Sequence, residues 1–107
     1  IMTINDVLSM GVLSYLHQAG ISVPADISVA GYDDLAFSEM LQTPLTTVRQ
    51  PLQEMCAVAA RLLISLINGA PGAAKPIMIS PEIILRASTM ERGVHASGPT
   101  LVINPSP

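Results

Sequence analysis

The order of apolar segments along the chain is the feature that most constrains its fold. Three short, almost continuously apolar stretches at residues 1–4, 27–32 and 45–48 alternate with two longer segments of helical pattern, residues 7–19 and 51–69. Strands that are apolar on both faces are typical of parallel sheets, because helices cover both sides of such sheets. The sequence therefore predicts an α/β fold in which a parallel sheet is flanked by helices.

Capping and turn residues mark the ends of the two long helices. Asn5 and Asp6 offer side-chain oxygens to the first free amide groups of the helix over residues 7–19, and Gly20 suits the left-handed position after it. Pro51 suits the first position of the second helix, where no amide hydrogen is needed. The first helix is apolar nearly all round, so we expect it to be buried on more than one side.

Smaller elements are expected elsewhere. Residues 35–41 predict a short helix, and residues 77–79 and 82–85 predict two further strands. Residues 70–76 are rich in Ala, Gly and Pro, which indicates a linker, and residues 91–107 show no clear period, which indicates a tail or loop.

The charge balance limits the partners of the chain. Charged residues make up only 12% of its 107 residues and the net charge is -3, whereas a soluble domain carries about 25% charged residues. A half-apolar composition excludes intrinsic disorder. Five scattered cations cannot form a phosphate-tracking patch, so this chain is not expected to hold nucleic acid by itself. They are Arg49, Arg61, Lys75, Arg86 and Arg92.

Several classes of protein are disfavoured by what the chain lacks. The most apolar stretch, residues 55–67, is interrupted by Arg61 and Ser65 and is shorter than the ~20 residues of a membrane span. No signal peptide is evident at the start, and the chain begins at Ile1 within an apolar run, which suggests a cut within a strand. The single cysteine, Cys56, excludes an internal disulfide and is expected to be a small core residue.

Catalytic and metal chemistry lack the residues that they need. Asp33 and Asp34 are adjacent, and side chains of adjacent residues on an extended chain point in opposite directions, so the two cannot share one reacting bond. His17 and His95 have no nucleophile or acid at a useful spacing. No glycine-rich phosphate loop and no Cys/His metal motif is present. The sequence predicts no enzyme activity, no metal and no cofactor.

Four motifs occur in the order and spacing of one known family. Asn5-Asp6 is followed by VPADISVAGYDD at residues 23–34 and by PLTTVRQP at residues 44–51. Pro81-Glu82 and then RAST at residues 86–89 complete the series. With these motifs the chain resembles the LacI/GalR family of bacterial transcriptional regulators over about residues 5–89.

The resemblance implies a particular place within a larger protein. Family members carry a helix-turn-helix domain, a hinge helix and an effector domain of two α/β subdomains, which resembles periplasmic sugar-binding proteins. Residues 1–90 would be the C-terminal part of that effector domain, a partial periplasmic-binding-protein-like type I fold, and the DNA-binding domain would be absent. By the same mapping, the helix over residues 51–69 packs in the N-terminal subdomain, and residues 47–50 cross between the subdomains.

Three residues are candidates for effector binding. Asp33 follows a strand at the sheet edge where open α/β sheets bind ligands, and a carboxylate there can accept two sugar hydroxyls. The family's first Asp of this motif contacts the effector, as does the Asn of its Asn-Asp motif, which implies the same role for Asp33 and Asn5. Gln50 is the third candidate because it follows the crossing strand. Helix capping is the alternative role for all three, although it suits Asp34 better than Asp33, and Asp6 is expected to be structural.

A second surface is implied by the same resemblance. Met10 and Leu41 lie on segments that pair across the two-fold axis of the family's dimer, so a homodimer interface is expected there, and ordinary core packing is the alternative. Only Arg49 lies near the cleft, which favours a neutral sugar over a phosphorylated effector. The expected protein is cytoplasmic and reaches operator DNA only through the absent domain. A periplasmic sugar-binding protein of a transporter is the rival function, and an enzyme of the same fold class is the third.

Overall fold

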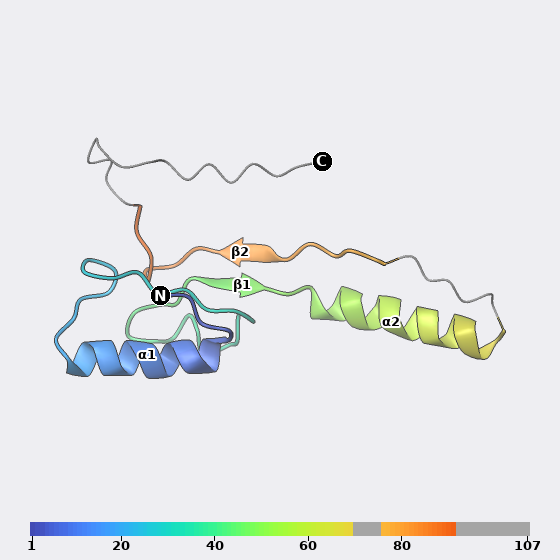
Figure 1. Ribbon diagram of the computed structural model, residues 1–107, viewed down its shortest axis with the longest axis horizontal. Coiled ribbons are helices and arrows are strands. Elements are labelled where there is room, and N and C mark those ends of the chain that lie inside the picture. Colours follow the sequence, from blue (N-terminus) through green and yellow to red (C-terminus); the bar gives the residue numbers. More distant parts are fainter. Residues whose placement is uncertain (70–75, 92–107) are drawn as a thin grey trace.

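The computed structural model describes residues 1–69 and 76–91. The predicted tail at residues 91–107, with His95, therefore lies outside the described residues apart from Glu91, and most of the predicted linker at residues 70–76 does too. Within the described residues, two helices and two short strands are formed. In chain order they are α1 (Asp6–Gln18), β1 (Thr47–Arg49), α2 (Leu52–Ile67) and β2 (Glu82–Ile84) (Figure 1).

Three segments run parallel to one another beside α1. Isolated parallel bridges join Met2 to Ala30 and Ala30 to Thr46, so the segment around Ala30 lies in the middle. Backbone hydrogen bonds from Thr3 N to Ala30 O (3.0 Å) and from Gly31 N to Thr46 O (2.9 Å) hold the three together. This confirms the parallel arrangement and the α/β class. The predicted strands at residues 1–4 and 27–32 contribute single bridges and not continuous ladders.

β1 and β2 form a separate two-stranded antiparallel sheet. Thr47 pairs with Ile84, Val48 with Ile83 and Arg49 with Glu82. β1 leads toward α2, whereas β2 runs back from the α2 end toward the core, and the two strands lie side by side in Figure 1. The second predicted strand at residues 82–85 is therefore confirmed with one residue less, whereas residues 77–79 form no strand.

The apolar core is small and lies under one face of α1. Leu16, Val29 and Leu45 are buried. Five half-buried apolar side chains pack against them: Val12, Leu13, Val23, Ile27 and Leu41. The other side of α1 is exposed, with Tyr15 69% accessible. The expected burial of this helix on several sides is wrong for the described residues, because nothing in them covers its outer face.

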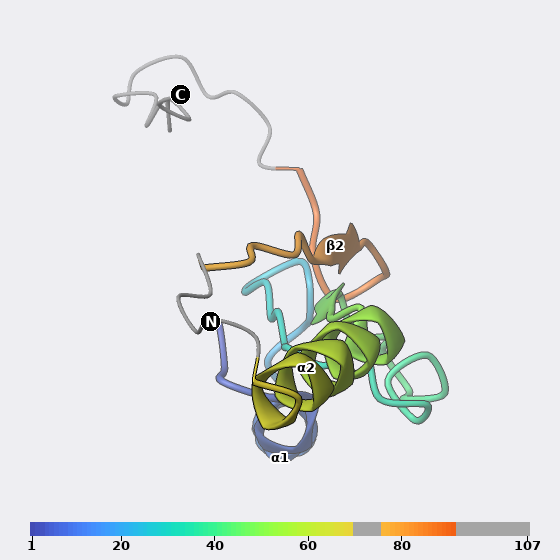
Figure 2. The same ribbon diagram turned by 90° about the vertical axis from the view of Figure 1, so that its right-hand side faces the viewer.

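α2 extends away from this core. It leaves the sheet along the long axis of the molecule in Figure 1, and Figure 2 looks along that axis from the α2 end. None of its residues is buried by the part of the chain that the structure describes. Cys56 is consequently exposed, which contradicts its predicted place in a core.

The ends of the helices agree closely with the sequence signals. Gly20 and Gly69 follow α1 and α2 with φ angles of 72° and 78°, the left-handed region that glycine adopts without a steric penalty. Pro51 is the N-cap of α2 and not its first helical residue, a shift of one position.

The short helix predicted at residues 35–41 is absent, because consecutive turns occupy this segment. Ser38 N donates to Leu35 O (2.8 Å) and Met40 N to Phe37 O (2.9 Å), which are bonds across three residues. The amide of Leu35 is instead bound by the carboxylate of Asp6 at 2.9 Å, and the carbonyl of Ser38 accepts from Leu45 N at 2.8 Å. The segment is therefore held by turn bonds across three residues, by Asp6 and by Leu45, and not by the bonds across four residues that an α-helix makes.

Candidate functional site

The loop after the central parallel segment carries two adjacent carboxylates. Asp33 has a φ angle of 110° and Asp34 a φ angle of 54°, which are uncommon values for residues other than glycine. Two bonds hold this backbone: Asp33 N donates to Val48 O (2.9 Å) and Asp34 N to Thr47 Oγ1 (3.3 Å). The loop therefore rests on β1, and its two carboxylates have different partners.

Asp33 and Gln50 are brought together. Gln50 Nε2 donates a hydrogen bond of 2.8 Å to Asp33 Oδ1, and both side chains are half-buried. Gln50 does not cap α2, whose N-cap is Pro51 with no side-chain bond from the described residues. The capping alternative for Asp33 fails as well, because no helix follows it. Two of the three candidate residues thus form one polar pair beside the crossing strand.

Asn5 caps a helix, which was the alternative to effector binding for this residue. Its backbone is extended and its Oδ1 accepts a hydrogen bond of 2.9 Å from Leu8 N, so it caps α1. Asp6 N donates to Tyr32 O at 2.9 Å, which joins the start of α1 to the residue before Asp33. Asn5 therefore lies at the same edge as the carboxylate loop. Within the described residues its Nδ2 group makes no hydrogen bond, so capping leaves this donor for other contacts.

Asp6 is the structural centre of this edge. Its carboxylate is fully buried. Oδ1 accepts from Thr47 Oγ1 at 2.6 Å, while Oδ2 accepts from Ser38 Oγ at 2.6 Å and Leu35 N at 2.9 Å. One side chain therefore joins α1, the turns after Asp34 and β1. The cost of burying this polar group is offset because both of its oxygens accept hydrogen bonds.

Asp34 forms two ion pairs for which the sequence gives no signal. Its Oδ2 lies 2.6 Å from Arg49 Nε and its Oδ1 lies 2.7 Å from Arg86 Nη2, and the side chain is only 7% exposed. Burial alone would raise the pKa of this carboxyl, but the hydrogen bonds and charges of Arg86 and Arg49 outweigh it and lower the pKa. The hydrogen bond to Asp34 in turn raises the pKa of Arg49.

The two neighbouring carboxylates therefore differ in their capacity to bind a ligand. Asp34 is neutralised by two guanidinium groups, whereas Asp33 has an amide as its partner and only one of its oxygens engaged by the described residues. A free carboxylate oxygen of this kind can accept hydrogen bonds from hydroxyl groups. No group of three or more metal-ligating side chains was found in residues 1–69 and 76–91. Within the same residues, no helix is long and apolar enough to cross a membrane.

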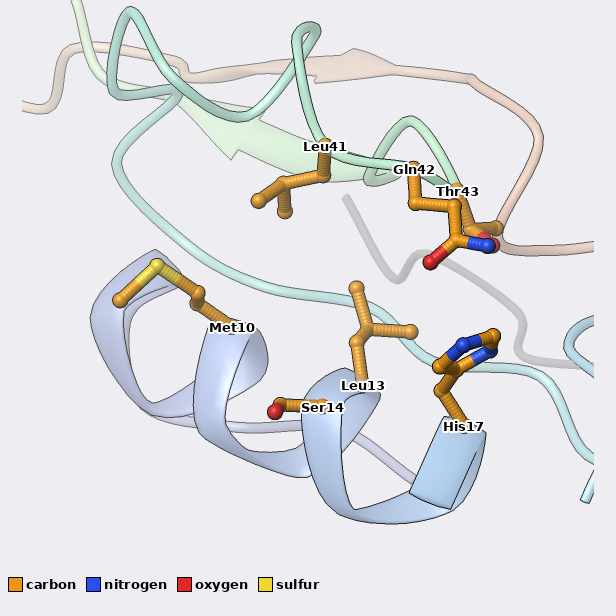
Figure 3. A pocket seen from close by; sticks show the side chains of 7 residues that line it. All are labelled: Met10, Leu13, Ser14, His17, Leu41, Gln42 and Thr43. Atoms are coloured by element: carbon orange, nitrogen blue, oxygen red, sulfur yellow. The ribbon is translucent and has the colours of Figure 1, made fainter. Parts of the chain in front are cut away.

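Met10 and Leu41 line a common groove. Figure 3 shows their side chains directed toward the space between α1 and the turn segment that follows residue 40. The groove holds about 210 Å³ and has a mixed polar and apolar lining. Its other lining residues are Leu13, Ser14, His17, Gln42 and Thr43. Met10 is 43% exposed, whereas Leu41 packs against the core. The core-packing alternative therefore applies in part to Leu41 and not to Met10.

The sequence places the chain among known proteins. Residues 1–89 match the family described as periplasmic binding protein-like domain. The chain belongs to this family. Its recognition as the LacI/GalR form of the domain is confirmed by its relatives, which include HTH-type transcriptional regulators and repressors. The partial periplasmic-binding-protein-like fold that the sequence predicts is confirmed as well.

Individual relatives show how far the likeness of this periplasmic binding protein-like domain extends. The arabinose metabolism transcriptional repressor of Geobacillus stearothermophilus is 41% identical over 88 residues, which are 81% of this chain and 24% of that protein. The crystal structure of a lac repressor dimer, bound to operator and the anti-inducer ONPF, has a TM-score of 0.76 at 28% identity, covering 84% of this chain and 31% of that one.

A third relative was solved with a sugar. It is a LacI family transcriptional regulator from Enterococcus faecium with bound ribose, with a TM-score of 0.72 at 32% identity, covering 82% of this chain and 33% of that one. The domain described here spans about a quarter of the length of the curated relatives that it matches.

Proposed function

We propose that this chain is the effector-sensing part of a LacI/GalR-type transcriptional regulator, and that it binds a small neutral sugar through Asp33 and Gln50, with Asn5 as a third contact. The observation that carries the proposal is the Asp33–Gln50 hydrogen bond of 2.8 Å. Asp33 belongs to the loop over the core, whereas Gln50 belongs to the segment that leads from β1 to α2. A ligand that contacts both residues therefore contacts both sides of the crossing.

The chemistry of the pair suits a polyol. The unengaged oxygen of Asp33 accepts a hydroxyl hydrogen, and the carbonyl oxygen of Gln50 accepts another. Arg49 and Arg86 do not supply a phosphate site, because Asp34 binds both guanidinium groups. The ribose bound by the relative from Enterococcus faecium and the arabinose metabolism controlled by the relative from Geobacillus stearothermophilus also support a sugar.

The proposed mechanism is allosteric. α2 packs in a second subdomain that other residues of the protein supply, which accounts for its exposed apolar face. The sugar bridges the two subdomains and binds one closure state better than the other, so it shifts the population of states and with it the operator affinity. Met10 and Leu41 contribute to a homodimer interface, as the dimeric lac repressor structure supports. The DNA-binding domain of the same protein contacts operator DNA, in the cytoplasm.

The experiment uses the full-length protein that contains this chain. Operator affinity is measured without sugar and with a panel of neutral pentoses and hexoses that includes D-ribose and L-arabinose. Asp33→Ala is expected to abolish the sugar response while operator affinity without sugar stays unchanged. Asp26→Ala is the matched control, since Asp26 is exposed and its carboxylate accepts a hydrogen bond from the nearby Ser22 amide. An undiminished response of Asp33→Ala contradicts the assignment of the site.

A further inference from the structure

Asp34 lies next to the proposed effector contact but is turned toward other partners. Its two carboxylate oxygens are bound separately, one by Arg86 and one by Arg49, at 2.7 Å and 2.6 Å. Asp34 makes no part of the Asp33–Gln50 pair. Its contribution to that pair, if it has one, must therefore pass through the backbone that the two aspartates share.

Arg86 is a fixed anchor for this carboxylate. Its side chain is only 14% exposed, and its Nη1 donates to Leu45 O at 3.0 Å. Its backbone amide donates to Thr46 Oγ1 at 2.9 Å. Both acceptors belong to the parallel segment that continues into β1, so the guanidinium cannot move without disturbing the core strand.

Arg49 is the second and more exposed anchor. It is 51% exposed and belongs to β1, where its Nη1 also lies 3.7 Å from Glu82 Oε2 of β2. The carboxylate of Asp34 is thereby joined to the core through one guanidinium and to the crossing strands through the other.

The backbone between the two aspartates needs such support. Both residues have positive φ angles, and residues other than glycine keep such backbone conformations only where surrounding contacts impose them. Consecutive residues share a peptide plane, so fixing Asp34 limits the orientations that are open to Asp33. Asp33 itself is held by two hydrogen bonds, one from its backbone amide to Val48 O and one from Gln50 Nε2 to its carboxylate.

We propose that Asp34 is a positioning residue of the effector site: its carboxylate, held between Arg86 and Arg49, fixes the positive-φ turn that directs the Asp33 carboxylate toward Gln50. This inference rests on the proposed function in so far as Asp33 is the effector contact. Because Arg49 belongs to a crossing strand, the position of Asp33 is tied to the segment that leads to α2.

The test compares Asp34→Asn with Glu82→Gln in the full-length protein. Both variants replace a carboxylate by its amide within the same charged group, but the Glu82 side chain is 69% exposed and lies 3.7 Å from Arg49 Nη1, without contact to Asp34 among the ion pairs of the described residues. Two quantities are measured: the Asp33 Oδ1–Gln50 Nε2 separation in a crystal structure without sugar, and the Kd for D-ribose by calorimetry. Operator affinity without sugar serves as the measure of an intact protein.

For Asp34→Asn we expect the separation to lengthen beyond hydrogen-bonding distance and the Kd for D-ribose to rise about tenfold, the loss of roughly one good polar contact. Operator affinity without sugar stays unchanged in both variants. In Glu82→Gln the Asp33–Gln50 separation and the Kd for D-ribose stay unchanged as well. Arg86→Lys keeps a cation beside Asp34 and is expected to retain more ribose affinity than Arg86→Ala. If Asp34→Asn does not fold, Arg49→Gln replaces it, because Arg49 is exposed and its loss removes one of the two anchors.

Three outcomes overturn the proposal or its premise. An unchanged Asp33–Gln50 separation with an unchanged Kd in Asp34→Asn overturns the positioning role. Equal losses in Asp34→Asn and Glu82→Gln overturn it too, since they indicate a general effect of charge. If the separation lengthens in Asp34→Asn but Asp33→Ala leaves D-ribose binding unaffected, the positioning role is supported and the effector role of Asp33 is overturned.

Discussion

α1 and α2 are both apolar helices, but only α1 is part of the core. α1 buries Leu16 in the apolar cluster and Asp6 and Ser9 in a polar one, whereas the 16 residues of α2 bury none within the described chain. Asp6 binds donors from two other segments, and nothing on α2 has a comparable role. An apolar face therefore does not by itself decide where a helix packs. α1 packs in the core because its buried side chains find partners in other segments, and α2 has no such partners within the described residues.

Removing the polar anchor of α1 is expected to have the largest effect. Asp6→Ala leaves the Leu35 amide and the hydroxyls of Ser38 and Thr47 without their acceptor. Because each unsatisfied buried group costs ~1–3 kcal/mol, we expect the free energy of unfolding to fall by at least about 3 kcal/mol in denaturant titrations. Asp26→Ala, which loses one exposed bond, should cost no more than about 1 kcal/mol. Equal losses in the two variants contradict the role given to Asp6.

Two glycine substitutions probe the same contrast with opposite signs. A Cβ on Gly31 would overlap Asp6 Oδ1 and lie 2.8 Å from Ser9 Oγ and 2.9 Å from Leu45 Cδ2. Gly31→Ala is therefore expected to destabilise the fold by roughly 2–3 kcal/mol. Gly11→Ala on α1 meets nothing within 4 Å and should stabilise the helix by about 1 kcal/mol. Thermal unfolding of both variants checks the two signs, and a stable Gly31→Ala protein would disprove the tight packing around Asp6.

The exposed face of α2 offers a third test. Leu63 is 59% exposed, so Leu63→Ala in this chain alone should change the free energy of unfolding by less than about 0.5 kcal/mol. In the full-length protein the same change should cost about 2 kcal/mol, because α2 is then covered by the second subdomain. Leu16→Ala is the buried control and should be destabilising in both settings. A Leu63→Ala variant that is neutral in the full-length protein would show that this face stays uncovered.

The smallest expected effect concerns pH. The pKa of Asp34 is lowered in the folded protein, so its ion pairs contribute stability above the ordinary carboxyl pKa of 3.8 and lose it as the pH falls through the lower folded value. The stability difference between wild type and Asp34→Asn should therefore be full at pH 7 and shrink below about pH 4. Denaturant titrations at pH 7 and pH 3 measure it. A difference that grows on acidification would contradict the ion pairs.

Local signals predicted the helices well. α1 begins and ends within one residue of its expected bounds, because Asn5 and Gly20 impose geometries that depend on their own side chains. The parallel order of the three apolar segments could also be inferred. The helix at residues 35–41 could not be excluded, because the carboxylate that binds Leu35 and Ser38 belongs to Asp6, which is distant in the sequence.

The site was predictable only in part. The sequence motifs and the strand ends singled out Asp33, Asn5 and Gln50, and the structure joins the first and last of these by a hydrogen bond. Asn5 illustrates a limit of such reasoning, since a good capping residue and a good ligand contact have the same side chain. The pairing of Asp34 with Arg86 had no local signal, because the two residues meet only after β2 has returned the chain to the core.

The sequence by itself determined the class of fold, the family, the ends of the helices and the residues on which a ligand site could be built. These properties depend on periodicity, on caps and on the order of motifs, all of which are local along the chain. Only the tertiary structure decided that Asp6 is a buried junction, that Asp34 is held between two arginines and that Asp33 faces Gln50. These arrangements depend on the folding of distant segments, which brings charges and donors together where little water is left to compete for them.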